Sequence, residues 1–187
     1  MAELIVDMLI SVDGSAYGTR SPGYFGLSGP DLEHWVAKED AIPRLNVMGR
    51  KTYEMMADLP AEDRDESWET MSKKPTMVFS RTLTTSEWPG VELCANDVVE
   101  EVRDRKRRSE HDLLTVGSLT LVHQLLNAGL VDHLRLLVFP LVLGESGEKP
   151  LFADIGDFAL ELVDQQVMDA GTVLLHYRPA GDPPYAE

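Results

Sequence analysis

The stretch Asn46-Val47-Met48-Gly49-Arg50-Lys51-Thr52-Tyr53 places a glycine between an apolar, strand-like run and a helix-like one. A second stretch, Leu113-Leu114-Thr115-Val116-Gly117-Ser118-Leu119-Thr120, follows the same plan further along the chain. A glycine at a strand-to-helix turn lets backbone N–H groups approach an anion, and the helix N-terminus adds a favourable partial charge. Two such turns on one small domain are therefore suited to the two ends of a dinucleotide diphosphate.

The residues after the first glycine indicate which dinucleotide would fit. Arg50, Lys51 and Thr52 supply positive charge and a hydroxyl group, a combination that suits an extra phosphate on a ribose. The pattern therefore favours NADPH over NADH. Neither turn is a standard nucleotide motif, since the first lacks the upstream glycine of a P-loop and the second has no GxGxxG. Each turn taken alone is more often an ordinary connection, and only the pair indicates a site.

Length and charge limit the classes of protein to consider. The 187 residues predict a single domain over 1–187, with 43% hydrophobic and 26% charged residues, as in soluble globular proteins. The net charge of −15 disfavours nucleic acid and anionic membrane as partners. A protein this acidic must gather its basic groups locally to bind an anionic cofactor. The candidates for such a cluster are Arg50, Lys51, Lys73, Lys74 and Arg81.

Cysteine, histidine and the N-terminus set further expectations. Cys94 is the one cysteine, so no internal disulfide forms, and this fits a cytoplasmic protein. The N-terminus is expected to be a first strand, and no run of 18 apolar residues predicts a membrane span. The histidines are scattered without an HxxxH spacing, so no metal site is predicted.

Periodicity and turn residues predict strands that alternate with helices. Such alternation favours a mainly parallel sheet covered on both faces, to which a C-terminal hairpin adds antiparallel strands. Residues 14–30 are expected to form a long loop, and 58–74 an acidic surface insertion with at most a helical turn. The strands are predicted at 3–12, 44–48, 75–79, 91–95, 113–116, 133–143, 158–168 and 171–178, and the helices from 31, over 50–57, after 96–97 and from 118 to 129.

Three local patterns carry their own predictions. Ser28 and Asp31 have the spacing of a capping box, which competes with any catalytic role for Asp31. Ser118 is expected to cap the helix that follows it. Pro140 lies inside the apolar run 133–143, which indicates an edge strand or a bulge there.

Several blocks in this order resemble the dihydrofolate reductases. They are Ser11-Val12-Asp13-Gly14, Met48-Gly49-Arg50-Lys51-Thr52-Tyr53-Glu54, Val78-Phe79-Ser80-Arg81 and Val116-Gly117-Ser118, with the terminal hairpin after them. Residues 125–134 and 139–144, followed by Leu151-Phe152, are similar to one branch of that superfamily, the reductase domain of the bacterial riboflavin enzyme and its stand-alone relatives. The resemblance spans residues 4 to about 178.

The resemblance implies a dihydrofolate reductase-like α/β fold that binds NADPH across the carboxyl ends of its strands. The cofactor-binding residues that it implies are Gly49, Arg50, Lys51, Thr52, Phe79, Ser80, Arg81, Val116, Gly117, Ser118, Leu119 and Thr120. Asp31 lies near the place of the family's single catalytic carboxylate. Lys74 lies where folate reductases use an arginine to bind the substrate carboxylate.

The implied activity is hydride transfer from NADPH to a small heterocycle or a carbonyl or imine carbon, pterin-like or pyrimidine-like. Two alternatives stay open. One is the 5-amino-6-(5-phosphoribosylamino)uracil reductase of riboflavin synthesis, and the other is a non-catalytic ligand-binding domain that kept the fold. The aromatic loop 14–30 is suited to closing over the nicotinamide. The long apolar strand 133–143 and the terminal hairpin predict a homodimer.

Overall fold

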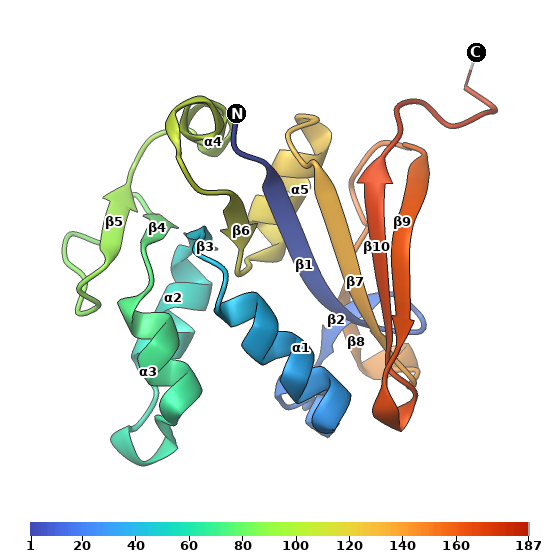
Figure 1. Ribbon diagram of the computed structural model, residues 1–187, viewed down its shortest axis with the longest axis horizontal. Helices are drawn as coiled ribbons and strands as arrows, with labels where there is room; N and C mark the ends of the chain where they lie inside the picture. Colours follow the sequence, from blue (N-terminus) through green and yellow to red (C-terminus); the bar gives the residue numbers. More distant parts are fainter. Residues whose placement is uncertain (187) are drawn as a thin grey trace. The chain divides into compact units, whose positions relative to one another are not determined.

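The structure is a computed structural model that describes residues 1–186, except for the side chain of Lys149. Figure 1 shows strands and helices that alternate over the first two thirds of the chain, with the paired β9 and β10 near its end. The strands are β1 (Leu4–Ser11), β2 (Ser15–Gly18), β3 (Leu45–Gly49), β4 (Thr76–Phe79), β5 (Val91–Cys94), β6 (Leu113–Thr115), β7 (His133–Phe139), β8 (Gly147–Pro150), β9 (Leu160–Val167) and β10 (Val173–Pro179). The α-helices are α1 (Pro30–Asp40), α2 (Arg50–Ala57), α3 (Glu66–Lys73), α4 (Val98–Arg108) and α5 (Leu119–Asn127).

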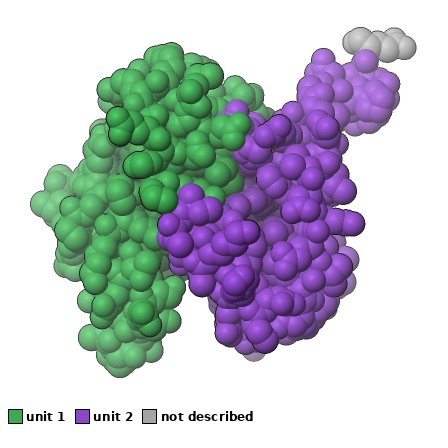
Figure 2. Space-filling model, viewed as in Figure 1, with its two compact units in different colours: residues 1–5, 43–130 green, residues 6–42, 131–187 purple. Residues whose placement is uncertain are grey.

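The chain divides into two compact units, coloured separately in Figure 2. The first contains residues 1–5 and 43–130, and the second contains 6–42 and 131–187. All the predicted cofactor residues belong to the first unit, whereas the predicted catalytic Asp31 belongs to the second.

In the first unit, β3 is paired in parallel with β4 on one side and with β6 on the other, and β5 joins β4, also in parallel. These strands are short and mostly apolar, and β3, β4 and β6 are largely buried, as in parallel sheets covered on both faces. Helix α2 packs on β3 and β4. The core beside them contains Met48, Tyr53, Ala57, Val78 and Trp88.

In the second unit, β10 pairs antiparallel with both β7 and β9, which confirms the predicted terminal hairpin. A register shift between His176 and Tyr177 marks a bulge against β9. The core of this unit joins Leu32 of α1 to Leu137 and Phe139 of β7 and Leu174 of β10. The charged side chain of Arg135, which lies on β7, is also buried.

The hydrogen-bonded order of the large sheet is β5-β4-β3-β6-β1-β7-β10-β9. This is a mostly parallel sheet with accompanying helices and antiparallel strands at its C-terminal end, as the alternation of strands and helices predicts. The short strands β2 and β8 form a separate antiparallel pair.

The prediction of a mere surface insertion at 58–74 is wrong, because this segment contains the helix α3. Asp65 caps it by accepting a hydrogen bond from the N–H of Trp68 at 2.9 Å. The Trp68 ring packs edge-on against Trp88 at 6.1 Å, and its indole N–H donates to the Met56 carbonyl at 2.7 Å. One aromatic anchor therefore ties an otherwise acidic segment to the core.

Two further expectations about strands need correction. Strand β7 is not an edge, because it lies between β1 and β10, and it ends at Phe139, so Pro140 falls just beyond it. The edge on this side of the sheet is β9. The predicted loop 14–30 contains β2, which pairs with β8, and the N–H of Leu151 donates to the Gly14 carbonyl at 2.8 Å.

Candidate functional site

The two glycine turns lie side by side. They follow β3 and β6, which are parallel neighbours in register at Val47 and Thr115. The N–H of Gly49 donates to the carbonyl of Gly117 at 3.0 Å, so the turns are directly hydrogen-bonded. The carboxyl end of β4 adjoins them, since Gly49 pairs with Phe79. The predicted turns therefore meet at one edge of a parallel sheet, where α/β proteins bind ligands.

Gly117 requires glycine, and Gly49 leaves little room for a side chain. A side-chain carbon at Gly49 would lie 2.6 Å from the hydroxyl oxygen of Ser118, inside van der Waals contact. Gly117 has a φ of +88°, and a side-chain carbon there would lie 3.1 Å from the Thr52 hydroxyl. The Gly117–Ser118 peptide bond is cis. The two turns thus pack backbone against backbone, with Thr52 and Ser118 at the contact.

Helices α2 and α5 begin at these turns without side-chain caps. Gly49 precedes α2 and has no side chain to offer. Ser118 occupies the N-cap position of α5, but its side chain makes no capping hydrogen bond, so the expected serine cap is wrong. The first N–H groups of both helices are left to other acceptors, which favours an anion at each N-terminus.

Arg50 is the first residue of α2 and is held by Glu54 one turn later. Its Nη1 donates to both carboxylate oxygens, at 2.9 Å and 2.7 Å. Both bonds use one nitrogen, so the Nε and Nη2 hydrogens are not used in this ion pair. Sequence reasoning missed Glu54, although its i,i+4 spacing from Arg50 is a recognisable signal.

The segment after β4 has a fixed backbone and an exposed charge. The buried Ser80 hydroxyl accepts from the N–H groups of Thr82 at 3.1 Å and Leu83 at 2.9 Å, so it shapes the turn. Phe79 is buried and contributes backbone only to this edge. Arg81 and Lys51 are exposed, and among residues 1–186 neither forms an ion pair.

The remaining predicted residues of the first unit divide into two places. Val116, Leu119 and Thr120 lie in the second turn and the first turn of α5, with Val116 and Leu119 half-buried. Lys74 lies elsewhere, just before β4 begins at Thr76, whereas Ser80 follows its end. Lys74 is therefore at the opposite end of β4 from the glycine turns.

In the second unit, Asp31 lies in the first turn of α1, where Gly29 is the N-cap and no side chain caps the helix. The predicted capping box with Ser28 is therefore wrong. The Asp31 carboxylate accepts from the N–H of Asp169 at 3.1 Å, and the Asp31 N–H donates to the Asp169 carboxylate at 3.3 Å. Asp31 is exposed and forms this reciprocal pair with the 3-10 turn at Asp169–Gly171.

Sequence reasoning also missed Thr115, the last residue of β6. Its side chain is 2% exposed, and its hydroxyl oxygen has no hydrogen-bond partner within the described residues. A buried polar atom without a partner is uncommon, and this one lies one residue before the Val116–Thr120 segment.

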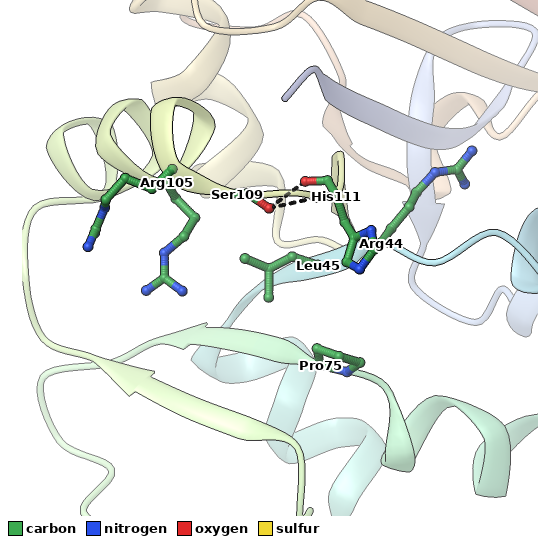
Figure 3. A pocket seen from close by; sticks show the side chains of 7 residues that line it. Arg44, Leu45, Pro75, Arg105, Ser109 and His111 are labelled. Atoms are coloured by element: carbon green, nitrogen blue, oxygen red, sulfur yellow. Dashed lines mark hydrogen bonds between the residues drawn. The ribbon is translucent and has the colours of Figure 1, made fainter. Parts of the chain in front are cut away.

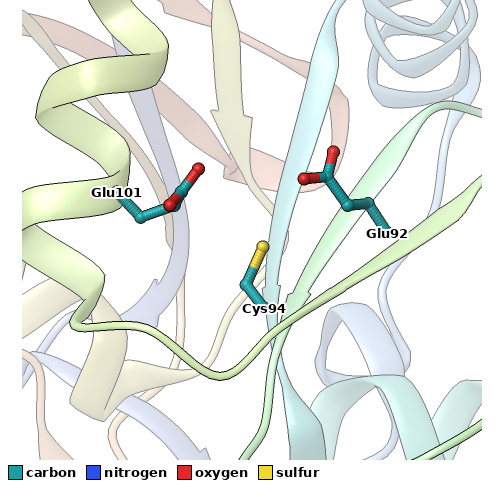
Figure 4. A group of neighbouring side chains, drawn as sticks. All are labelled: Glu92, Cys94 and Glu101. Carbon is teal, nitrogen blue, oxygen red and sulfur yellow. The ribbon is translucent and has the colours of Figure 1, made fainter.

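One cluster of the first unit has metal-ligating side chains, those of Glu92, Cys94 and Glu101, whose ligand atoms lie within 4.8 Å of one another (Figure 4). Arg105 already neutralises the carboxylates, since it donates to Glu92 at 2.6 Å and 2.9 Å and to Glu101 at 3.2 Å. Burial raises the pKa of the Cys94 thiol to about 11, so it stays protonated and is a poor ligand. We interpret the cluster as an ion-pair network.

The family model of the RibD C-terminal domain matches residues 2–174. Among curated proteins, the chain is 29% identical over 182 residues to the uncharacterized protein YyaP of Bacillus subtilis, with 93% of each chain covered. No helix in residues 1–186 is long and apolar enough to cross a membrane.

Solved structures share the fold. A putative riboflavin biosynthesis protein from Shewanella sp. PV-4 superposes with a TM-score of 0.76 at 23% identity, covering 96% of this chain and 99% of that one. A deaminase/5-amino-6-(5-phosphoribosylamino)uracil reductase from Thermotoga maritima gives 0.68 at 16% identity, and the match covers 96% of this chain and 57% of that one.

Dihydrofolate reductase from Enterococcus faecalis, complexed with NADP(H), superposes with a TM-score of 0.63 at 18% identity, over 95% of this chain and 96% of that one. The fold and the resemblance predicted from the ordered blocks around Gly49, Phe79 and Gly117 are confirmed. The chain belongs to the family of RibD C-terminal domains and shares its fold with dihydrofolate reductase.

Proposed function

We propose that the protein is an NADPH-dependent reductase that transfers a hydride to a small heterocyclic, carbonyl or imine substrate. One observation supports it most: two glycine turns joined by the 3.0 Å bond from Gly49 to Gly117, each opening a helix without a side-chain cap. Two uncapped helix N-termini at one sheet edge would hold a diphosphate through backbone N–H groups. The cofactor, when bound, supplies the hydride, and the protein positions it.

The charges around these turns favour the phosphorylated cofactor. Arg50, Lys51 and Arg81 are the cations of the two segments that follow β3 and β4. A hydrogen bond between a cation and a ribose 2′-phosphate contributes about 1.5–3 kcal/mol, and NADH lacks that phosphate. The chain as a whole has a net charge of −15, so the binding of an anionic cofactor depends on the local cations Arg50, Lys51 and Arg81.

The test is a fluorescence titration of the protein with NADPH and with NADH. We expect NADPH to bind more tightly, and Arg50→Ala to weaken NADPH about tenfold or more while leaving NADH nearly unchanged. The matched control is Arg107→Ala, which removes an exposed cation of α4 that lies outside the glycine turns. An equal loss for both cofactors in Arg50→Ala would contradict the assignment.

A more specific candidate is the reduction of a ribosylaminopyrimidine. It is favoured by the RibD family and by the name of the Thermotoga maritima relative. A steady-state assay with NADPH and 5-amino-6-(5-phosphoribosylamino)uracil tests it directly. NADPH binding without turnover of this pyrimidine, of pterins or of simple imines would instead support the non-catalytic alternative.

We also propose a cytoplasmic homodimer. The edge strand β9 exposes apolar side chains, with Leu162 at 49%, Val163 at 46% and Val167 at 74% exposure. An uncovered edge with such side chains tends to be buried by a partner. Light scattering should give twice the 20.8 kDa chain mass, and Val167→Lys should lower it. A mass of one chain at all concentrations would exclude the dimer. The proposed cytoplasmic location is tested separately, by cell fractionation.

A further inference from the structure

A pocket of about 360 Å³ lies at the amino ends of β3 and β4 in the first unit. Figure 3 shows that its walls come from the end of α4 and the following loop, from the start of β3, and from the residue before β4. Leu45 begins β3 and Gly49 ends it, so the pocket is separated from the glycine turns by the length of that strand, roughly 13 Å. The pocket and the proposed cofactor edge are therefore distinct places.

The lining of this pocket has an unusual charge for so acidic a protein. It contains three arginines and a histidine, a serine, and two apolar residues, but no carboxylate. The lining residues are Arg44, Leu45, Pro75, Arg105, Arg108, Ser109 and His111. The whole chain has 32 acidic against 17 basic residues, so a wall with arginines alone is a local concentration of cations.

The acidic partners of these arginines do not belong to the lining. Arg105 is bound through its Nη atoms to Glu92 and Glu101. Arg108 pairs with Asp104. The carboxylates fix the direction of the guanidinium groups without facing the space themselves. Because the guanidinium groups are already fixed in place, their hydrogen bonds to an anion in the pocket offset much of the free energy that the anion loses when it leaves water.

One buried donor of this wall has no acceptor. The Nε of Arg105 is inaccessible to solvent and has no hydrogen-bond partner in the described residues, although both Nη atoms are bonded. Buried N–H donors in native proteins nearly always have a partner, so the chain itself does not fully satisfy the Arg105 guanidinium. The Ser109 hydroxyl is already used, since it donates to the His111 carbonyl and accepts from the His111 N–H.

We propose that this pocket binds a small organic anion, a phosphate or carboxylate group attached to an apolar body. The anionic group lies against Arg105 and Arg108, and the apolar part lies on Leu45 and Pro75. The volume of about 360 Å³ is in the usual range for small-molecule sites. This binding is separate from the proposed reductase function and does not depend on it.

The probe is phenyl phosphate, which has both parts, beside inorganic phosphate and phenol, which have one each. Titration of ¹⁵N-labelled protein should give saturable shifts of the amide signals of Leu45, Ser109 and His111. Phenyl phosphate should bind more tightly than inorganic phosphate, and phenol should not bind. Aromatic carboxylates such as benzoate should shift the same signals if the charge, and not the phosphate geometry, is what the arginines recognise.

The decisive variant is Arg108→Gln, and Arg107→Gln is its matched control. Both arginines pair with Asp104, and their side chains are similarly exposed, 62% and 58%, but Arg107 does not line the pocket. Arg108→Gln should weaken phenyl phosphate about five- to tenfold, and Arg107→Gln should change it less than about twofold. Arg105→Lys, which keeps the charge but loses the planar guanidinium that Glu92 and Glu101 hold in place, should also weaken binding in a protein with an unchanged amide spectrum elsewhere.

Three results would overturn the proposal. They are no saturable shift at residues 109–111, equal weakening by Arg107→Gln and Arg108→Gln, and displacement of phenyl phosphate by NADPH. The last would place the ligand at the glycine turns, and its accompanying shifts would appear at Gly49 and Gly117. Because the signals are residue-specific, failure of this site leaves the NADPH titration unaffected, and failure of NADPH binding leaves this test intact.

Discussion

Among the residues of the second unit, Arg135 is the one whose replacement we expect to lower the free energy of unfolding most. It lies on β7, and its Nε and Nη2 donate to the Asp7 carboxylate of β1 at 2.6 Å and 2.7 Å. Its Nη1 donates to Glu39 of α1 at 2.6 Å. The guanidinium carbon is 5.2 Å from the centre of the Trp35 ring. One cation therefore joins β1, β7 and α1, the helix in which Asp31 lies.

The burial of this group determines the size of the effect. The side chains of Arg135, Asp7 and Glu39 are 9%, 17% and 14% exposed. Arg135→Met keeps most of the volume but leaves two partly buried carboxylates without their cation. Breaking a buried ion pair from one side costs about 3–5 kcal/mol, mostly through the charge left behind. For a chain of this size that corresponds to a melting temperature lower by about 6–20 °C.

The measurement is urea unfolding of the wild type and of Arg135→Met at several pH values. In the variant, the pKa values of Asp7 and Glu39 should rise, because burial then acts on the carboxylates without the cation. A raised pKa in the folded state favours the protonated form, so the deficit relative to wild type should shrink as the pH falls from 7 towards 5. Adding Asp7→Asn and Glu39→Gln to Arg135→Met should recover part of the loss at neutral pH.

Arg107→Met is the comparison, because its ion pair with Asp104 is exposed and should contribute less than about 1 kcal/mol. If Arg135→Met lost no more than Arg107→Met, the cluster around Arg135 would be a surface interaction and the reasoning from burial would be refuted. A loss that did not change with pH would show instead that packing against Trp35, and not the two carboxylates, sets the cost.

Three further predictions concern pH and substrate. Hydrogen bonds from the Ser11 hydroxyl and, to a smaller extent, from the N–H groups of Gly144 and Leu143 lower the pKa of Asp13 from 3.8 to about 2. The stability that this shift contributes is lost as the pH falls from about 4 to about 2, so acid unfolding of Asp13→Asn should lack that component. Burial, and then His133 and Arg135, lower the pKa of His176, so stability should fall as the pH drops below 6.5, and His176→Gln should flatten that decline in urea titrations. Turnover of dihydrofolate should be weak; a kcat/KM above about 10⁵ M⁻¹s⁻¹ that Asp31→Asn abolishes would make the protein a true folate reductase.

The two glycine turns of the proposed cofactor edge could be predicted because their determinants are local. A glycine after an apolar run, followed by a helix-like stretch, specifies a turn whatever the rest of the chain does, and Gly49 and Gly117 show this. That the two turns would touch follows from the parallel pairing of β3 with β6, which the alternation of elements made probable.

The parts that could not be predicted depend on contacts between distant residues. Helix α3 is held by Trp68 on Trp88, and no periodicity over 58–74 reveals that anchor. The pairing of β2 with β8 joins residues 15–18 to 147–150, two short polar segments without a strand signature. Pro140 was predicted to mark a sheet edge or a bulge, but a proline cannot tell a strand end from a sheet edge, and here β7 simply ends.

The ion pair between Arg50 and Glu54 affects how Arg50 can bind a phosphate. An i,i+4 pair on a helix surface contributes only about 0.2–0.5 kcal/mol, whereas each hydrogen bond from a guanidinium to a phosphate contributes about 1.5–3 kcal/mol. Glu54 therefore cannot withhold Arg50 from a 2′-phosphate. Because Glu54 accepts only from Nη1, the guanidinium can keep this bond and still offer Nε and Nη2 to an anion at the start of α2. The Glu54 carboxylate thus restricts the Arg50 side chain before an anion binds, so less side-chain entropy is lost on binding. We interpret Glu54 as a positioning residue for Arg50.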